Sequence, residues 1–507
     1  MSSTFFGISV ATSGLYVSQR ALDTTGHNIS NMATVGYVRQ RVDQMDKVYL
    51  KSGQYQVGTG SGIETVCQLR SVFLDNMYRK EQSNLSYWQT KSSTLEDIEA
   101  VMNDLSDNGG LETALDEFFN AWEEVSKDVS STATRSSLLG YADSLVETLN
   151  QLDNQLDQIQ ENLDTQIESM VEDINTIAKQ VSELNVKIVK SESNGDNAND
   201  YRDELNTLLD TLSEYVNISV STDSNGMYRV SIGGASLVNG TDINELTCIT
   251  NSSNGAFNTV IWAESGTELK LKDGMLLGLI EARGDVNGDT GSTGNGSIVE
   301  SGTDEAAVDA DAGSYDFTGK SKNLIPELRT GLNMLVSLLA RKINAIHSSG
   351  EGLAGSTGIN FLVKIDDKLP FEIGNIQVNP DLDDTDLIAA SSIGGANDGL
   401  IAAEIVDFSE TDYFQYDGLA MNIREYYSKL VGWIGTQGEE AENSASSQAV
   451  LVQQIETNKE SLSSVSMDEE LANLLKYQHA YNASARIMSI IDGMLEKLIE
   501  ETGLVGR

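Results

Sequence analysis

Few side chains in this sequence have the types and spacing that catalysis or metal binding requires. His27, His347 and His479 are isolated from one another and from the two cysteines, and no HExxH motif occurs. A packed or surface imidazole is therefore a better interpretation than a metal ligand. Cys67 and Cys248 lie far apart without a CxxC pattern, which indicates neither a disulfide framework nor a nucleophile with a traceable partner.

Two further patterns resemble chemistry but have simpler explanations. VGTGSG (57–62) lacks the Lys-Ser/Thr of a phosphate loop, and the strand-like IETVCQL follows it, so it predicts a turn. The pairs Glu439-Glu440, Glu469-Glu470 and Glu500-Glu501 are adjacent, and neighbouring side chains on a helix point in different directions. We interpret them as surface or capping charge. The sequence predicts no catalytic site, no cofactor and no metal site.

Composition limits the classes of partner. The 507 residues include 33 Lys+Arg and 77 Asp+Glu, a net charge of -44, which disfavours contact with a nucleic-acid backbone. No apolar run approaches the ~20 residues of a membrane span, and MSSTFFGISV lacks the features of a secretory signal. We expect a protein that stays in the cytosol or leaves by a route that reads another signal.

The region near the N-terminus has a heptad pattern that predicts a helix pair. Two columns repeat every seven residues there: Ile8, Leu15, Leu22 and Ile29, and a mostly small-residue column of Ala11, Ser18, Thr25 and Met32. This spacing predicts one side of a close helix pair. The helix runs from about residue 8 to residue 32, a length of ~37 Å.

A matching helix is predicted at the other end of the chain. Ser466 and Glu469 form a capping box, and a seven-residue repeat follows through Met467, Leu474, Tyr481, Met488 and Leu495. Each terminal helix has an apolar stripe but no local partner. We expect the two helices to pack on each other or on neighbouring subunits.

The strongest apolar periodicity lies between the ends. It runs from Leu145 to Ile188 with spacings of four and three, apart from a stutter at Ile159, Leu163 and Ile167, and predicts one helix of ~66 Å. Shorter helices are predicted at Ser83–Leu105, Leu111–Val129, Asp203–Val216, Leu324–His347 and Ala449–Val465. These shorter helices lie close enough in sequence to cover the long one.

After Val216 the pattern changes to period two. NISV, the alternating YRVSI after the Asn225-Gly226 turn, and FNTVIW predict strands, whereas the polar segment 284–320 predicts a surface insertion or a poorly ordered loop. We predict a mainly α fold with an inserted β-rich domain (α+β, multidomain). Its parts are an inner coiled-coil module (1–45 and 466–507), a discontinuous helical bundle (46–215 and 322–465) and a β-rich outer domain (216–321).

The two ends also resemble a known family. SGLYVSQRALDTTGHNISNMATVGYVRQ (13–40) is similar to the N-terminal motif of bacterial flagellar axial proteins of the rod, hook and hook-associated group. The C-terminal segment SMDEELANLLKYQHAYNASARIMSIIDGMLEKLIEETGLVGR (466–507) is similar to the C-termini of hook-associated proteins at the hook–filament junction. The resemblance covers roughly the first 220 and last 100 residues.

This resemblance implies a non-enzymatic subunit that joins hook to filament and self-associates in a helical tube. It implies export by the flagellar type III system, a final location in the extracellular flagellum, and contacts with hook protein and with the next hook-associated protein or filament. It also implies a cytosolic chaperone at the C-terminal region and terminal helices that fold on incorporation. The resemblance assigns the assembly role to Leu15, Leu22, Ile29, Leu474, Tyr481 and Leu495, and the family motif to Asn28, Asn31, Gly36 and Tyr37.

Two features depart from the family pattern. Val35 stands where the family has the proline of TPGY, and the segment 284–320 has no counterpart. Two alternatives share the long helices and the β-rich module: a secreted adhesin or phage-tail-like fibre protein, and an enzyme carried on the inserted module. An adhesin or fibre protein would not need its two chain ends to pair.

Overall fold

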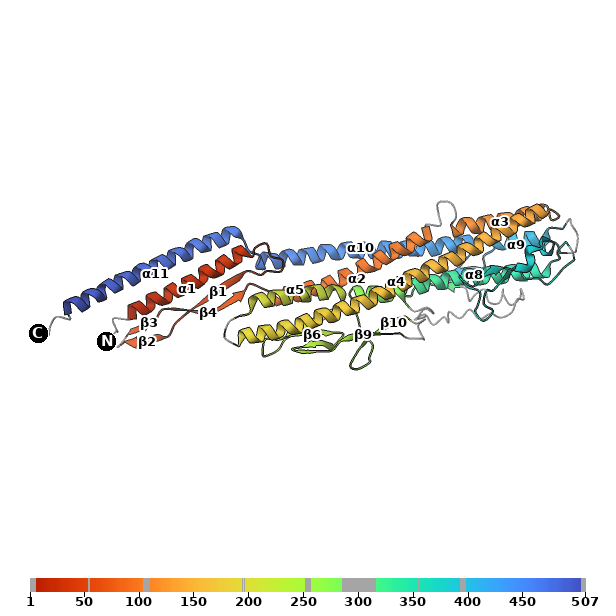
Figure 1. The fold of residues 1–507 in the computed structure, drawn as a ribbon. Helices are drawn as coiled ribbons and strands as arrows, with labels where there is room; N and C mark the ends of the chain where they lie inside the picture. The colour runs from red at the N-terminus through yellow and green to blue at the C-terminus, as the bar shows by residue number, and fades with distance from the viewer. Residues whose placement is uncertain are drawn as a thin grey trace.

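The computed structural model describes residues 6–52, 55–103, 110–193, 195, 197–250, 257–284, 316–353, 355–392 and 398–502. The long helices follow one common axis, so the molecule is a rod (Figure 1). Both chain ends lie at the same end of this rod. Most of the predicted insertion 284–320 falls outside the described residues.

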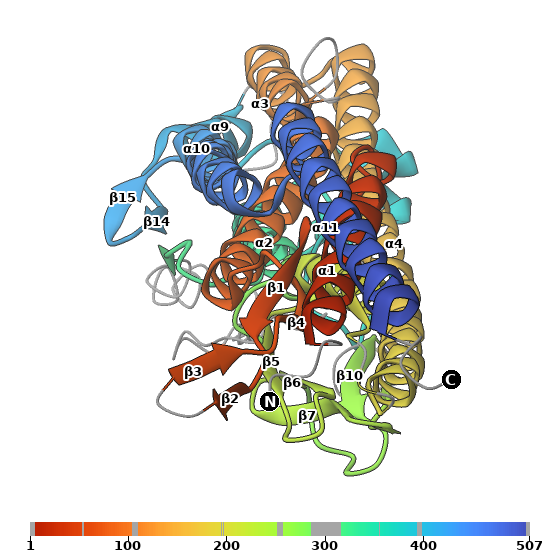
Figure 2. The ribbon, with the colours of Figure 1, turned by 90° about the vertical axis from the view of Figure 1, so that its left-hand side faces the viewer.

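The chain ends form one module, which confirms the predicted pairing. α1 (Phe6–Ser30) runs antiparallel to α11 (Met467–Thr502), and α1 also packs on a β-ribbon (Figures 1 and 2). Ala11, Ser18 and Thr25 of the small-residue column are buried on α1. Small side chains let a helix approach its neighbours closely, and here they let α1 lie between two partners.

The β-ribbon follows α1 directly. β1 (Gln40–Asp46) pairs antiparallel with β4 (Ser61–Gln68), and β2 (Tyr49–Ser52) pairs with β3 (Tyr55–Gly58). The predicted turn at 57–62 therefore joins β3 to β4. The predicted division gives residues after 45 to the helical bundle, whereas the ribbon packs along α1. Its first strand is largely polar, so it lacks the apolar alternation that marks a strand in sequence.

Seven of the described helices build most of the rest of the rod. They are α2 (Val72–Asn103), α3 (Leu111–Lys127), α4 (Thr132–Glu192), α5 (Asn199–Tyr215), α8 (Leu324–Ser349), α9 (Leu400–Glu410) and α10 (Ile423–Ser463). The predicted apolar stripe of α4 is buried throughout except at Ile159. There, at the predicted stutter, the neighbouring Gln160 is fully buried and donates a hydrogen bond to Arg283 O (2.7 Å). The stutter thus rotates the buried face.

Three helices begin well before their predicted positions, among them α4, which begins at Thr132 and not at Leu145. α10 begins at Ile423, not at Ala449, and α2 begins at Val72, not at Ser83. Gly432, Gly435 and the polar residues after them weaken the apolar pattern in the first part of α10. Packing overrides that weak propensity, because α10 and α2 lie side by side along the rod.

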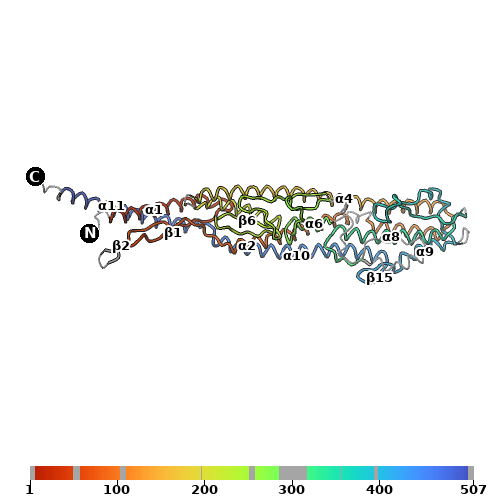
Figure 3. Tube along the Cα trace, turned by 90° about the horizontal axis from the view of Figure 1, so that it is seen from below, coloured from red at the N-terminus to blue at the C-terminus, as the bar shows by residue number. Residues whose placement is uncertain are grey.

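The β-rich insertion lies along α4, away from the chain ends. β5 (Ile218–Thr222), β6 (Tyr228–Ile232), β7 (Ala235–Asn239) and β8 (Asp242–Ile243) form a four-stranded antiparallel sheet in sequence order, and β9 (Leu246–Thr250) pairs with β10 (Asn258–Trp262). Asn185 of α4 donates hydrogen bonds to Tyr228 O (2.9 Å) and Gly240 O (2.8 Å). Figure 3 shows the sheet beside α4.

The remaining elements complete the core farther along the rod. They are α6 (Met275–Arg283), β11 (Asp316–Phe317), β12 (Leu362–Val363), β13 (Gln377–Val378), η3 (Pro380–Asp383), η4 (Thr385–Leu387), β14 (Phe414–Tyr416) and β15 (Leu419–Met421). Most of the large buried residues of these elements and of the seven helices belong to one continuous apolar cluster. That cluster does not extend into α1 or α11, so the terminal module has to be held by other contacts.

Candidate assembly interface

A buried polar cluster joins the terminal module to the long helical part. Asn28, in the last turn of α1, is 1% exposed, and its side-chain oxygen accepts hydrogen bonds from Tyr37 Oη (2.8 Å) and Gln40 N (3.0 Å). Its amide nitrogen donates to Gln40 O (2.9 Å) and to Glu470 Oε2 (3.2 Å). One side chain thereby connects α1, the following loop, β1 and α11.

Arg39 strengthens this connection by pairing with both glutamates at the start of α11. Its Nε lies 2.7 Å from Glu470 Oε1, and its Nη1 lies 2.7 Å from Glu469 Oε2. The sequence interpretation of this acidic pair as surface charge is wrong for Glu470, which is 2% exposed, whereas the Glu469 side chain is 63% exposed. The bonds from Arg39 and Asn28 offset the cost of burying the Glu470 charge.

We call the buried polar cluster of Asn28, Tyr37, Arg39, Asp203 and Glu470 the joint. Asp203 of α5 is its residue on the long helical part. Asp203 is 6% exposed, and its carboxylate accepts hydrogen bonds from Val38 N (3.2 Å) and Gln68 Nε2 (2.7 Å), with Arg70 Nη1 at 3.8 Å. Burial raises the pKa of Asp203 to about 7, although the Val38 amide and Arg70 act in the opposite direction. The joint therefore contains a carboxyl group that titrates near neutral pH.

The Tyr37 hydroxyl is held in its protonated form. Burial raises the pKa of Tyr37 above its ordinary value, and the negative charges of Asp200, Asp203 and Glu470 raise it further. A protonated hydroxyl can donate its hydrogen bond to Asn28. Tyr37 therefore fixes the orientation of the Asn28 amide, which in turn fixes the bonds that Asn28 makes to β1 and α11.

The other motif residues shape the loop between α1 and β1. Gly36 has a φ of 79°, and a Cβ atom added there would lie 2.3 Å from Thr207 Oγ1 of α5. Glycine is the residue that fits this left-handed, closely packed position. Asn31 donates to His27 O (3.1 Å) and so satisfies a carbonyl at the end of α1. Val35, at the family's proline position, is 91% exposed.

The two terminal helices meet along small residues. Gly7 of α1 lies against Ile491, and Gly14 lies against Ser484 of α11. The predicted assembly residues flank this line of contact: Leu15, Leu22, Ile29, Leu474 and Leu495 are half-buried, and Tyr481 is 37% exposed. Their role in contacts between subunits stays a prediction.

A set of apolar side chains on α11 faces water, and the heptads alone did not indicate it. Ile487, Ile490, Met494 and Leu498 are 50%, 57%, 64% and 50% exposed. Their spacings of three, four and four place them along one side of the helix. We call these four residues the α11 stripe. An exposed apolar surface of this kind marks an interaction site.

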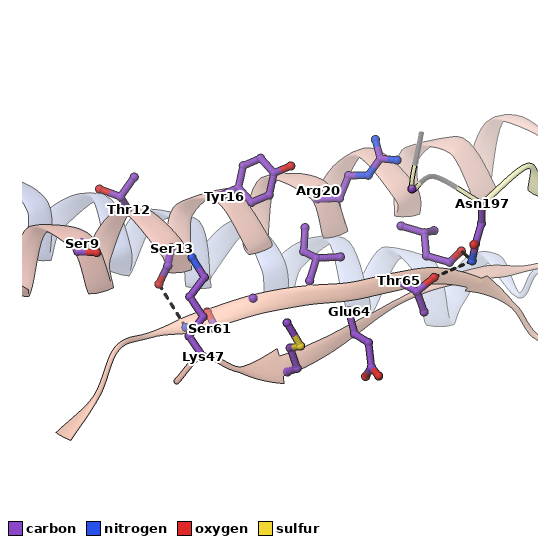
Figure 4. A pocket seen from close by; sticks show the side chains of 15 residues that line it. Ser9, Thr12, Ser13, Tyr16, Arg20, Lys47, Ser61, Glu64, Thr65 and Asn197 are labelled. Carbon is purple, nitrogen blue, oxygen red and sulfur yellow. Dashed lines mark hydrogen bonds between the residues drawn. The ribbon is translucent and has the colours of Figure 1, made fainter. Parts of the chain in front are cut away.

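A groove runs between α1 and β4 (Figure 4). Its volume is about 880 Å³, and its lining includes Tyr16, Arg20, Lys47 and Glu64. At one end Ser13 Oγ accepts a hydrogen bond from Ser61 N (3.2 Å). The lining residues include a single carboxylate and neither histidine nor cysteine. This combination suits contact with protein surface better than acid–base chemistry.

The histidines and cysteines occupy structural or surface positions. His347 is fully buried; its Nε2 accepts from Ala389 N (2.9 Å), and burial lowers its pKa to about 4. Cys67 Sγ donates to Asp43 (3.1 Å). His27 lies 3.0 Å from the Tyr37 hydroxyl, and His479 is exposed. Within the described residues there is no His/Cys/Asp/Glu group arranged to hold a metal ion.

No helix in the described part of the chain combines the length and the apolar character that a bilayer span requires.

Comparison with known proteins identifies the family. Residues 95–362 match the family described as flagellar hook-associated protein FlgK helical domain, and residues 460–501 match the flagellar basal body rod FlgEFG protein C-terminal family. Flagellar hook-associated protein 1 of Bacillus subtilis (strain 168) is 29% identical, with 100% of both chains covered. The Escherichia coli (strain K12) protein of the same name is 23% identical over 97% of this chain and 99% of its own.

A solved structure agrees at the level of the fold. The flagellar hook junction protein FlgK from Burkholderia pseudomallei has a TM-score of 0.60 at 14% identity, with 77% of this chain and 100% of that chain covered. The full-length relatives decide against the adhesin, fibre and enzyme alternatives. Because the helical-domain match alone covers more than half of the 507 residues, this chain belongs to the FlgK family of flagellar hook-associated proteins, which are structural and not enzymatic.

Proposed function

We propose that this protein joins the flagellar hook to the filament as a subunit of a helical tube. Hook protein contacts it on one side, and the next hook-associated protein or the filament contacts it on the other. Copies of the chain contact one another through the terminal module of α1, the β-ribbon and α11. In this proposal these contacts include the assembly residues Leu15, Leu22, Ile29, Leu474, Tyr481 and Leu495, which are half-buried or exposed on α1 and α11.

The α11 stripe is the observation that supports this proposal most directly. In the single chain, Ile490 and Met494 are more than half exposed, whereas the apolar stripe of α4 is buried. Covering the α11 stripe in a tube would recover burial energy of roughly 25 cal/mol per Å² of apolar surface. The exposed apolar surface is therefore an unfinished interface that a neighbouring subunit completes.

Export fits the same arrangement. We propose that the flagellar type III system exports the chain, that a cytosolic chaperone covers its C-terminal region beforehand, and that the terminal helices become fully ordered on incorporation. The apolar stripe would make the free α11 prone to wrong contacts. A chaperone that binds it would remove this liability until the subunit reaches its place.

A complementation experiment tests the proposed function. A strain that lacks the gene should be non-motile, with hooks that lack filaments, and the wild-type chain should restore filaments. Ile490→Asp should fail to restore them because it places a charge in the α11 stripe. Ser489→Asp is the matched control, since Ser489 is exposed on the same helix one residue away. Normal swimming of the deletion strain, with altered adhesion, would overturn the proposal.

A further inference from the structure

The contacts between α1 and α11 follow a strict seven-residue correspondence. Gly7 meets Ile491, Gly14 meets Ser484 and Asn28 meets Glu470, so each heptad step forward on α1 is one heptad step back on α11. Ala21 and Tyr477 occupy the intervening step and line the same small pocket. The pair therefore has a single register along its described length.

Most of this correspondence does not distinguish the observed register from a neighbouring one. If α11 shifted by one heptad toward its N-terminus, Gly14 would face Ile491 and Ala21 would face Ser484. Both are again small residues on α1 opposite the same partners. The repeat that predicts the helix pair thus also permits its slippage.

The polar end of the pair does distinguish the registers. After a one-heptad shift, Asn28 would face Tyr477, and Glu470 would lose both Asn28 and Arg39. Leaving a buried carboxylate without its partners costs far more than replacing one small contact by another. A single buried polar contact is known to set the register of heptad-repeat helices in this way.

We propose that Asn28, Arg39 and Glu470 form a register key, which fixes the alignment of the two terminal helices and hence the position of the α11 stripe on the rod. This inference rests on the proposed function, because the stripe must be correctly placed to meet a neighbouring subunit. Glu469 shares Arg39 but is exposed and has no bond to Asn28, so it is not part of the key. The short link of Ser464 to Ser466 between α10 and α11 also restrains α11, and the test has to separate the two restraints.

Disulfide trapping reads the register. The ideal Cβ of residue 14 lies 3.6 Å from Ser484 Cβ, within the range for a disulfide. In a chain with Cys67→Ser and Cys248→Ser, the pair Gly14→Cys with Ser484→Cys reports the observed register. The pairs Gly14→Cys with Ile491→Cys and Gly7→Cys with Ser484→Cys report the two one-heptad shifts. A Gly/Ser insertion of one heptad after Ser464 removes the restraint of the link.

In the purified full chain with the lengthened link, we expect the observed-register pair to form at least about tenfold faster than either shifted pair, a preference of ~1.4 kcal/mol. Glu470→Ala should reduce that ratio to near one, whereas Glu469→Ala should leave it within about twofold. An unchanged ratio in Glu470→Ala, or an equal loss in Glu469→Ala, would overturn the register key. Because the readout is made on purified protein, its failure would be distinct from a failure of filament assembly in cells.

Discussion

α4 and α11 are both long amphipathic helices with seven-residue apolar repeats, but their apolar side chains differ in burial. Ile174 of α4 is fully buried, whereas Ile490 of α11 is 57% exposed. α4 is covered by α3, α5, α6 and the β-rich insertion, and α11 packs on α1 alone among the long helices. The same pattern therefore describes a finished core in one region and an interface that awaits a partner in the other.

The difference follows from how many elements surround each helix. A long helix needs several neighbours to cover a wide apolar face, and sequence-adjacent helices supply them for α4. At the end of the rod, α11 has one helix as a neighbour, and that helix is lined with small residues such as Gly7 and Gly14. Small contacts allow a close approach but leave much of α11 uncovered.

Replacing one isoleucine in each helix by alanine should give the largest difference in the free energy of unfolding between the two helices. Ile174→Ala should lower the free energy of unfolding by ~2–5 kcal/mol because it leaves a cavity in a packed core. Ile490→Ala should change the free energy of unfolding of the dilute protein by less than ~0.5 kcal/mol, because its side chain already contacts water. Urea unfolding of both variants measures the difference. Equal destabilisation would remove the distinction between the two helices.

The joint between the two regions should respond to pH through Asp203. Its folded pKa of about 7 lies above the ordinary value of 3.8, so its contribution to stability is fully present below pH ~4 and is lost as the pH rises through 7. Relative to Asp203→Asn, the wild-type chain should therefore lose ~2 kcal/mol between pH 5 and pH 8. Unfolding at each pH tests this change.

Two glycines near the joint should respond in opposite directions to the same substitution. Gly36→Ala should destabilise the chain by ~1–2 kcal/mol, because φ is positive and Thr207 occupies the space that the new Cβ needs. Gly26→Ala should stabilise it by ~0.5–1 kcal/mol, because Gly26 lies within α1 and nothing would contact its Cβ. Thermal unfolding compares the two variants. A stabilising Gly36→Ala would contradict the described loop.

The smallest effect is expected at the position where this chain departs from the family. Val35 is 91% exposed, so Val35→Ala removes almost no packing. We expect a change in unfolding free energy below ~0.5 kcal/mol and normal filament formation. A loss of filaments with unchanged stability would show that this loop contacts another subunit.

Periodicity predicted the helices well but not the joint. The apolar stripe of α4 and the pairing of the two chain ends could be predicted from residue spacing, because each helix carries its own apolar repeat. The burial of Glu470 could not be read, because it depends on Arg39, which is more than four hundred residues earlier in the chain. Of the β-ribbon, the strand-like IETVCQL indicated β4, whereas β1 was missed because it is largely polar and gains its place from packing on α1.

The residue spacing in α11 also did not show which side of this helix is exposed. The heptad positions Leu474, Tyr481 and Leu495 lie on one side of the α1 contact line, whereas Ile487, Ile490 and Met494 of the α11 stripe lie on the other side. A helix with apolar residues on more than one side gives an ambiguous stripe in sequence. One signal could have found it: the isoleucine, methionine and leucine residues at 487, 490, 494 and 498 make a second pattern of three and four.

Hydrogen exchange tests the central claim that α11 is completed by a neighbouring subunit. Amides of α11 between Ile487 and Leu498 should exchange rapidly in the dilute full-length protein and at least about a hundredfold more slowly in isolated flagella. Amides of α4 around Ile174 should be protected to the same degree in both samples, because their cover comes from their own chain. Equal protection of the α11 segment in the dilute protein and in flagella would contradict the account.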